Sequence, residues 1–234
     1  MNFLKAEWRK LAIINYEIDP EILLPYLPIG TELDFYNGKC YVSLVGFMFL
    51  NTKLLGLPIP FHRNFEEVNL RFYVKKKQDG VWKRGVVFIK EIVPKPALSF
   101  VANTIYKENY HTMPMKNQIH EKEGELLIRY SWKDKSWHSI QIMADSTPKP
   151  MEENSEFEFI TEHYFGFTKK ENTTSEYEVC HPKWDFYTIK DHCLEIDFQK
   201  IYGDDFECLN HQEPVSVMLA EGSEIEVKTK KHIN

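Results

Sequence analysis

The feature that most constrains this chain is the regular alternation of apolar and polar side chains along short stretches. The clearest case runs from residue 68 to residue 74 and holds two sets of side chains: Val68, Leu70, Phe72 and Val74 in one set, Asn69, Arg71 and Tyr73 in the other. Successive residues of a β-strand point to opposite faces of the sheet. The pattern therefore predicts a strand that buries its apolar set.

Other stretches extend this pattern. Tyr41 to Leu50 and Val86 to Val93 are nearly apolar on both faces, which is typical of strands that are covered on both sides. Residues 125–132 and 137–143 flank a short polar turn and predict a hairpin. Residues 194–199 alternate as a strand, and residues 214–229 predict a last hairpin with its turn at Glu221–Gly222.

Three segments carry signals for helix starts. Asp19 is a good N-cap with Pro20 at the first helical position, and Pro96 opens a helix that we expect to continue to residue 110. Ser155 with Glu158 forms a capping box. Many strands and few short helices predict a mainly β fold (α+β), a closed or partly closed antiparallel β-barrel. We expect one domain over residues 1–234, with a surface loop over residues 145–155.

Composition narrows the classes of function. The chain has 234 residues and a net charge of −6, which argues against a nucleic-acid partner, because phosphate neutralisation needs an excess of Lys and Arg. No apolar run is long enough to span a bilayer, so we expect no membrane partner. The first 19 residues are broken by charges and do not resemble a secretory signal. The four cysteines lack C-x-x-C spacing, and reduced thiols in the cytoplasm fit them best.

The first candidate site lies in the stretch from His62 to Val74, where Glu67, Asn69, Arg71 and Tyr73 project from one face of the strand. If this face lines a barrel interior, Arg71 can pair with a carboxylate and Glu67 can move a proton, with Asn69 beside them. The alternative is that the same face is simply the solvent side of a half-buried strand.

Two further clusters carry weaker signals. Lys90 and Glu91 are consecutive, so on a strand only one of them can face the interior, and burial would shift its pKa. The alternative is a strand end that has left the core. Cys180–His181 and His192–Cys193 lack the spacing of zinc sites, so we expect no metal site. No phosphate-binding glycine loop occurs, and we expect no cofactor.

The order of these segments resembles a known family. The stretch NYEIDPEILLPYLPIGTELD resembles the opening of acetoacetate decarboxylase-like proteins, and FEEVNLRFYV resembles their strand with an aromatic residue before a glutamate. KPALSFVANTIY resembles their EPAIAVGREL-type helix, and YHTMPMK falls at their YPKK-type motif. From about residue 3 to about residue 228 the chain most resembles the YqjF-type group of this superfamily, a domain family of unknown function. The likeness to the true decarboxylases covers roughly the first half.

The resemblance implies a barrel with a central cavity. In the decarboxylases, the first lysine of the motif forms a Schiff base with the substrate ketone, and the second helps to depress its pKa. By this motif Met115 falls on the Schiff-base lysine, Lys116 on its helper, Glu67 on the strand glutamate and Glu17 on an arginine. A thioether cannot form an imine, so decarboxylation by this route is not expected. A shift of one residue in the motif would instead make Lys116 the nucleophile.

Three hypotheses follow. The first is a small organic carbonyl or carboxylate ligand in the cavity, bound without Schiff-base chemistry. The second is a lyase or hydrolase that uses Glu67 or His111 as its acid–base group. The third is a structural or interaction module whose barrel is filled by aromatic side chains, with a homo-oligomer possible in each case. The predicted site has two groups of residues: Glu67, Lys116 and His111 as catalytic candidates, and Asn69, Arg71, Tyr110, Arg63 and Met115 as ligand-binding candidates.

Overall fold

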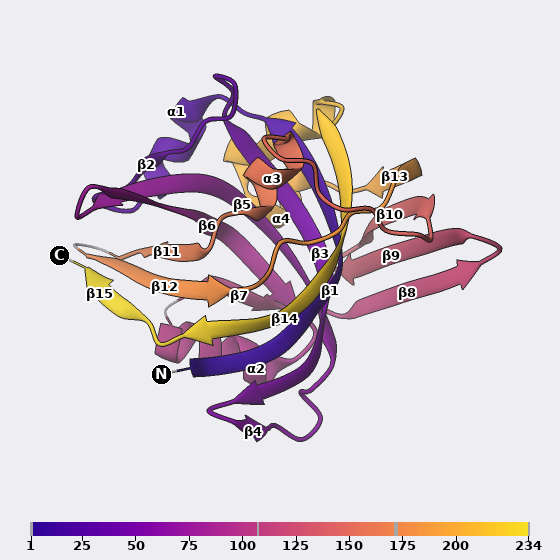
Figure 1. The fold of residues 1–234 in the computed structure, drawn as a ribbon, viewed down its shortest axis with the longest axis horizontal. Helices are drawn as coiled ribbons and strands as arrows, with labels where there is room; N and C mark the ends of the chain where they lie inside the picture. Colours follow the sequence, from indigo (N-terminus) through magenta and orange to yellow (C-terminus); the bar gives the residue numbers. More distant parts are fainter. Residues whose placement is uncertain (1, 107, 171–172, 234) are drawn as a thin grey trace.

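The computed structural model describes residues 2–106, 108–170 and 173–233 of the chain. A large sheet curls round on itself, and a smaller sheet projects from one side (Figure 1). The strands of the large sheet are β1 (Asn2–Glu17), β2 (Glu32–Leu33), β3 (Tyr41–Leu54), β4 (Leu57–Pro58), β5 (Phe65–Gln78), β6 (Val81–Val93), β7 (Tyr110–Thr112), β11 (Phe165–Lys169), β12 (Thr174–Cys180), β14 (Ser216–Lys228) and β15 (Lys231–Ile233). The smaller sheet contains β8 (Met115–Lys122), β9 (Glu125–Lys133), β10 (Trp137–Asp145) and β13 (Ile189–Glu195).

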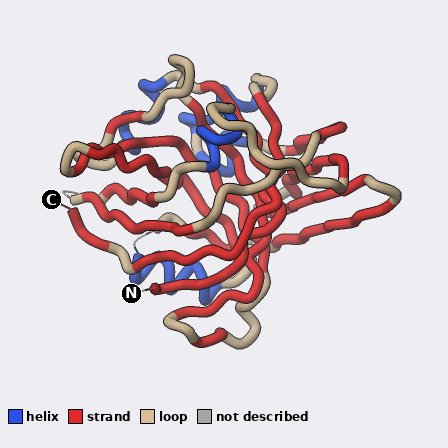
Figure 2. The backbone as a smooth tube through the Cα atoms, viewed as in Figure 1, coloured by secondary structure: helices blue, strands red, loops and turns tan. Residues whose placement is uncertain are grey.

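Helical segments are few and short, as the tube in Figure 2 shows. They are α1 (Pro20–Leu23), α2 (Pro96–Val101), α3 (Glu156–Thr161) and α4 (Phe198–Tyr202), with the 3₁₀ segments η1 (Leu24–Tyr26) and η3 (Asp204–His211) and the π-helical turn η2 (Ala102–Tyr106). The caps at Asp19 and Ser155 are confirmed, since each side chain accepts a hydrogen bond from a backbone N–H of the first turn. Among the described residues, no helix is both long enough and apolar enough to span a lipid bilayer.

The large sheet closes into a ring because β6 has two partners. The order β5-β3-β1-β14-β12-β11-β6 returns to its start, since β6 also pairs with β5. The closure is short: β6 and β11 share only the pairs Phe165–Gly85 and Gly166–Val86, and they run parallel. The mainly β, partly closed barrel is confirmed, with parallel pairing at β6–β11 and β6–β7 as the departure from an antiparallel arrangement.

The alternation over residues 68–74 is confirmed. Val68, Leu70, Phe72 and Val74 are all buried, in a core between the ring and the smaller sheet. The opposite face of β5 turns into the ring, where Phe65 and Tyr73 belong to a second core. The ring strands thus have a solid core on one face and the ring interior on the other.

Two β-bulges exchange the faces along a strand. In β1 the pairing with β3 slips between Arg9 and Ala12, and in β6 the pairing with β5 slips beside Leu70. An extra residue in one strand reverses which alternate positions face inward. As a result Trp8 and Leu11 both line the ring interior, although a regular strand would send them to opposite faces.

Three sequence predictions are wrong in detail. Residues 216–228 form the single strand β14, because β1 pairs with it along nearly its whole length; Gly222, at φ 82°, permits a bend there and not a turn. Phe198 begins α4 and does not extend a strand, since the Asp197 side chain caps that helix at the Lys200 N–H. The helix from Pro96 ends before Tyr110, which opens β7, and residue 107 of that prediction lies outside the described residues.

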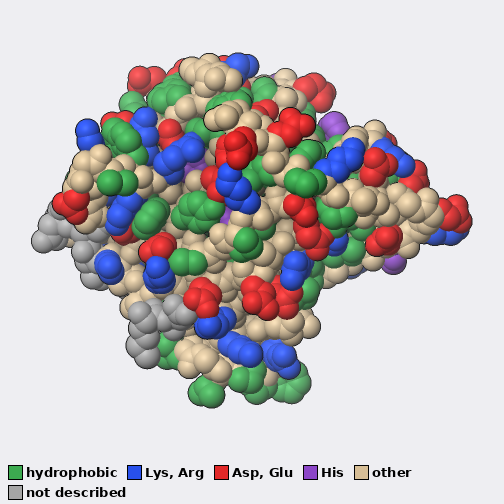
Figure 3. Space-filling model, in the orientation of Figure 1, with side chains coloured by type: hydrophobic (Ala, Val, Ile, Leu, Met, Phe, Trp, Pro, Cys, Tyr) green, Lys and Arg blue, Asp and Glu red, His purple; other side chains and the backbone are tan. Residues whose placement is uncertain are grey.

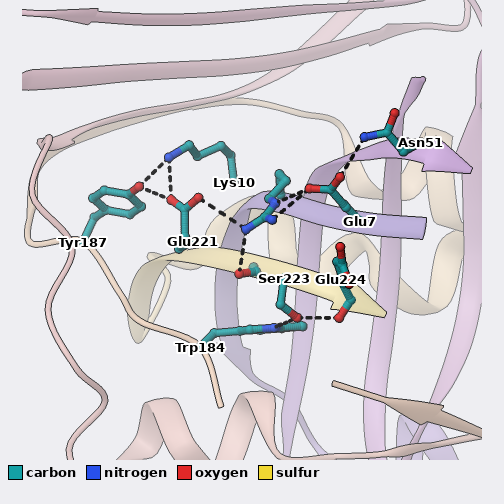
Figure 4. Close-up of polar contacts among 10 residues, drawn as sticks. Glu7, Lys10, Asn51, Trp184, Tyr187, Glu221, Ser223 and Glu224 are labelled. Atoms are coloured by element: carbon teal, nitrogen blue, oxygen red, sulfur yellow. Dashed lines mark hydrogen bonds and ion pairs between the residues drawn. The ribbon is translucent and has the colours of Figure 1, made fainter. Parts of the chain in front are cut away.

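A polar network ties the bend of β1 to that of β14 (Figure 4). Lys10, at φ 55°, directs its ammonium to the Glu221 carboxylate at 2.5 Å and to the Tyr187 hydroxyl. Trp184 donates its indole N–H to Ser223 at 2.9 Å. The network therefore holds the loop that carries residues 184–187 against the ring, and Trp184 reaches the interior from this loop.

Candidate functional site

The ring encloses a cavity with a volume of about 230 Å³. Its wall is largely aromatic and aliphatic, from residues such as Phe47, Phe49, Phe88 and Trp184. The exposed member of the lining is Ala97 of α2, so the cavity meets solvent beside this helix. The polar side chains that line the cavity are Thr52, His62, Glu67, Asn69, Arg71, Glu91, Glu108, Tyr110, Thr161, His163, Tyr177 and His181.

Three adjacent strands bring the central polar groups together. Strand β5 supplies Glu67, Asn69 and Arg71 from one face, and Asn69 lies directly opposite Glu91 of β6. Glu91 in turn lies beside Tyr110 of β7. Residues paired across a sheet share a face, so one continuous polar stripe crosses three strands inside an otherwise apolar cavity.

Glu67 is held by two hydrogen bonds. Asn69 donates its amide to Oε1 at 2.9 Å, and the Tyr110 hydroxyl donates to Oε2 at 3.1 Å. Burial raises the pKa of Glu67 to about 7, against the lowering effect of these two bonds and of the Arg71 charge. Glu67 is therefore poised to change its protonation state near neutral pH. Glu66, on the opposite face, accepts a hydrogen bond from Asn117 instead.

Glu91 is also enclosed, and its pKa lies well above the ordinary value. Burial is the largest cause, followed by repulsion from Glu67 and from Glu108. Its Oε2 atom is buried without a hydrogen-bond partner in the described part of the chain. This burial disfavours the ionised form of the Glu91 carboxyl group. Its neighbour Lys90 leaves the cavity face and donates to the backbone oxygen of Ile201.

Arg71 is the cation of this cavity. It is 9% exposed, donates to the Ile160 carbonyl at 3.4 Å and lies over the Tyr73 ring at 5.6 Å. No carboxylate within the described ranges forms an ion pair with it. Buried guanidinium groups are normally paired with an acid, so Arg71 retains the capacity to bind an anion.

The far wall contains two imidazoles. His163 approaches Asp34, which also accepts a 2.7 Å hydrogen bond from Arg84. His181 stacks on Trp184 with 4.2 Å between the ring centroids. Burial lowers the pKa of each histidine to about 4, so both are neutral at physiological pH. They add hydrogen-bonding capacity without adding charge.

Glu108 contacts the cavity and already forms an ion pair in its wall. Its Oε1 atom accepts from the Lys230 ammonium at 2.9 Å and from the Thr168 hydroxyl at 2.7 Å. Both members of the ion pair have side chains that are 8% exposed. This pair closes one part of the wall and leaves Glu67 and Glu91 as the carboxyl groups with unfilled bonding capacity.

The structure divides the residues predicted for the site. Glu67, Asn69, Arg71 and Tyr110 line the cavity together, whereas the others do not: His111, Met115, Lys116 and Arg63. His111 is exposed because it follows Tyr110 on β7 and points to the opposite side. The functional roles assigned to all of these residues stay predictions.

The side chains of the other three residues do not reach the cavity. Lys116 is in β8 of the smaller sheet, with its ammonium 4.3 Å from the centre of the Trp137 ring. Met115 packs against the core on that side, and Arg63 is exposed and donates to Asn51 at 3.2 Å. The expected combination of Glu67 with Lys116 and His111 therefore does not form around this cavity. No lysine occurs among the described residues that line it.

Sequence reasoning missed Glu108, His163, His181 and Trp184 and left the direction of Glu91 open. The signal for Glu91 was present, because a carboxyl group in an apolar strand is unusual. The histidines and Trp184 gave no such signal, since they come from loops and turns that only the closed ring brings to the cavity. Among the described residues, no cluster of three or more metal-ligating side chains is found.

A family model for uncharacterised conserved proteins, DUF2071, matches residues 5–224 of this chain. The chain belongs to the DUF2071 family. The uncharacterised protein YqjF of Bacillus subtilis (strain 168) is 28% identical over 186 residues, which cover 77% of this chain and 74% of YqjF. This confirms the resemblance to the YqjF-type group.

Solved structures similar to this DUF2071 protein share its acetoacetate decarboxylase-like fold. Acetoacetate decarboxylase from Legionella pneumophila superposes with a TM-score of 0.67 at 15% identity, over 99% of this chain and 87% of the other. The enduracididine biosynthesis enzyme MppR in complex with pyruvate gives 0.67 at 11% identity, over 100% and 91%. An acetoacetate decarboxylase-like enzyme from Sphingomonas wittichii RW1 gives 0.66 at 11% identity, over 100% and 94%. At these identities the similarity establishes the fold alone.

Proposed function

We propose that this protein binds a small organic carboxylate inside the ring, with the carboxylate on Arg71 and the apolar remainder against the aromatic wall. The observation that carries the proposal is the buried Arg71 guanidinium, which lines the cavity and has no carboxylate within ion-pair distance among the described residues. A guanidinium binds a carboxylate through two parallel, charge-assisted hydrogen bonds. In this proposal the ligand supplies the missing charge.

The shape and polarity of the cavity support the same class of ligand. Small-molecule sites are concave and mostly apolar, with a few convergent polar groups, and this cavity fits that description. A volume of about 230 Å³ accommodates a small acid and disfavours the alternative of a filled barrel. The similarly folded MppR, whose complex contains pyruvate, supports a carbonyl acid as the first ligand to try. The four free cysteines are in keeping with a cytoplasmic location, which is part of the proposal.

The proposal is tested by calorimetry with pyruvate, 2-oxohexanoate and hexanoate. We expect binding to the native protein and a loss of about tenfold or more in Arg71→Met, because a charge-assisted hydrogen bond contributes roughly 1.5–3 kcal/mol. Arg129→Met is the matched control, since Arg129 lies on the smaller sheet in an ion pair with Glu195. Equal affinities in the native protein and Arg71→Met, or no binding of any of the three acids, would contradict the proposal.

A further inference from the structure

We propose that Glu67 and Glu91 form an acid–base pair that enolises a 2-oxo acid in the cavity, an inference that rests on the ligand binding proposed above. Both side chains are almost fully buried, at 2% exposure each, and both line the same apolar cavity. They stand on neighbouring strands, since Glu91 is opposite Asn69 and Glu67 is two residues before Asn69. Apolar residues of similar size would pack in this cavity wall at least as well as two enclosed carboxyl groups. Packing therefore does not explain why the carboxyl groups are there.

The surroundings give the two carboxyl groups different roles. Glu67 accepts hydrogen bonds on both of its oxygens, from Asn69 and from Tyr110, and these bonds stabilise its ionised form. Glu91 has one buried oxygen without a hydrogen-bond partner among the described residues, and the charges of Glu67 and Glu108 disfavour its ionised form, so it keeps its proton. Groups whose environments separate their proton affinities serve as the base and the acid of one reaction. Glu67 is accordingly the base, and Glu91 is the acid.

The order of groups along β5 indicates the class of substrate. Arg71, the anchor for the carboxylate, is two residues from Asn69 and four from Glu67 along β5. The corresponding spacings of about 7 Å and 13 Å separate backbone positions and not the ends of the side chains, and the Arg71 charge acts on the Glu67 carboxyl group. Glu91 is level with Asn69 and therefore lies between the anchor and the base. A ligand that extends from Arg71 toward Glu67 presents its carboxylate first, then an oxygen at Glu91, then a carbon at Glu67. A 2-oxo acid has its carboxylate, ketone and C3–H bonds in this sequence.

The proposed step is balanced without a cofactor. The Glu67 carboxylate takes a proton from C3, and the electron pair of that C–H bond forms the C2–C3 double bond. The π pair of the ketone moves to its oxygen, which takes the proton of Glu91. The products are the enol, a neutral Glu67 and an ionised Glu91. The Tyr110 hydroxyl, which donates to Glu67 and lies beside Glu91, can pass the proton back and reset the pair.

Exchange of hydrogen at C3 measures this step directly. The protein is incubated with 2-oxohexanoate in D₂O, and loss of the C3 proton signal is followed by NMR, with binding measured in parallel by calorimetry. We expect faster exchange than in buffer, and a rate about 100-fold or more slower in Glu67→Gln and in Glu91→Gln, since general acid–base groups contribute roughly 10²–10⁴-fold. Affinity for the acid should change only a few-fold in these variants. Glu66→Gln is the control, because Glu66 is on the same strand but faces away from the cavity.

Each other outcome has a defined meaning. Binding of 2-oxohexanoate without exchange above the buffer rate overturns the inference and leaves the proposed function intact. Exchange that persists in Glu67→Gln or in Glu91→Gln overturns the assigned pair. Binding of hexanoate but not of 2-oxohexanoate overturns the substrate class. If no carboxylate binds, the proposed function itself fails.

Discussion

At the scale of the residue, Glu67 shows what the alternation of polar and apolar residues can predict. The alternation of polar and apolar residues predicted that Glu67 lies on the polar face of a strand, and it placed Asn69 and Arg71 on the same face. The inward direction of Glu91 was not readable, because a bulge in β6 reverses the faces between Phe88 and Glu91. Alternation predicts which residues share a face within a regular strand, but it cannot locate an inserted residue.

The raised pKa of Glu67 makes a prediction about stability. A carboxyl group whose pKa rises from 4.5 unfolded to about 7 folded binds more protons in the folded state between these values. The free energy of unfolding therefore falls as pH rises from 4.5 to 7, by up to about 3 kcal/mol from this group, and is constant above that range. The groups that face Glu67 are Arg71 and Asn69 on its own strand, Glu91 on β6, Glu108, and Tyr110 on β7.

Urea denaturation of Glu67→Gln at pH 5 and pH 8 checks this. Glutamine does not titrate, so the variant should gain stability relative to the native protein as the pH rises. The two histidines with lowered pKa titrate equally in both proteins and cancel in the difference. Glu66→Gln, on the opposite face of the same strand, is the substitution control. A native-minus-variant difference that is the same at both pH values would mean that Glu67 is ionised in the folded protein at pH 5.

At the scale of the element, the sequence predicted correctly those features that depend on hydrogen bonds between residues close together in the chain. The Ser155 capping box predicted the start of α3, and the hydroxyl accepts the Glu158 N–H at 3.1 Å as expected. Residues 216–228 were misread because a glycine after a charged residue has the same local signal in a turn and in a bend. The long partner β1 decided between them, and that pairing joins residues about 200 positions apart.

The cap of α3 is linked to the site, because this helix carries the Ile160 carbonyl that accepts from Arg71. Ser155→Ala removes the acceptor for the Glu158 N–H and a donor to the Glu152 carbonyl. We expect a loss of about 1 kcal/mol in the free energy of unfolding, measured in urea. Ser146→Ala in the same connecting segment is the control and should change the stability little. Equal stabilities of the two variants would show that the cap does not stabilise the helix.

At the scale of the whole molecule, the sequence predicted a barrel and could not predict how it closes. The two pairs between β6 and β11 that complete the ring leave no periodic signal in either strand. The position of the entrance could not be predicted from the sequence either, because it depends on where α2 lies relative to the segment that contains β4. Apolar side chains gather at that end of the surface in Figure 3, and they include Leu55, Leu57 and Phe61.

The entrance beside α2 gives a prediction about access. Ala97 is exposed and borders the cavity, so Ala97→Trp should obstruct the opening and weaken binding of 2-oxohexanoate by about tenfold or more, without an effect on stability. Phe100→Trp is the matched control, because Phe100 is on the same helix, is 71% exposed and does not line the cavity. Calorimetry compares the affinities, and thermal melting confirms that both variants fold. Unchanged affinity in Ala97→Trp would place the entrance elsewhere.

The two faces of β5 have a consequence for how this protein can diversify. Its even-numbered residues from 68 to 74 belong to the solid core, and its odd-numbered residues from 65 to 71 line the cavity. Substitutions at the odd positions can alter what is recognised while the even positions continue to secure the fold. A library randomised only at residues 67, 69 and 71 should therefore yield mostly folded proteins with new ligand preferences. The same separation would let relatives in a lineage acquire different chemistry on an unchanged scaffold.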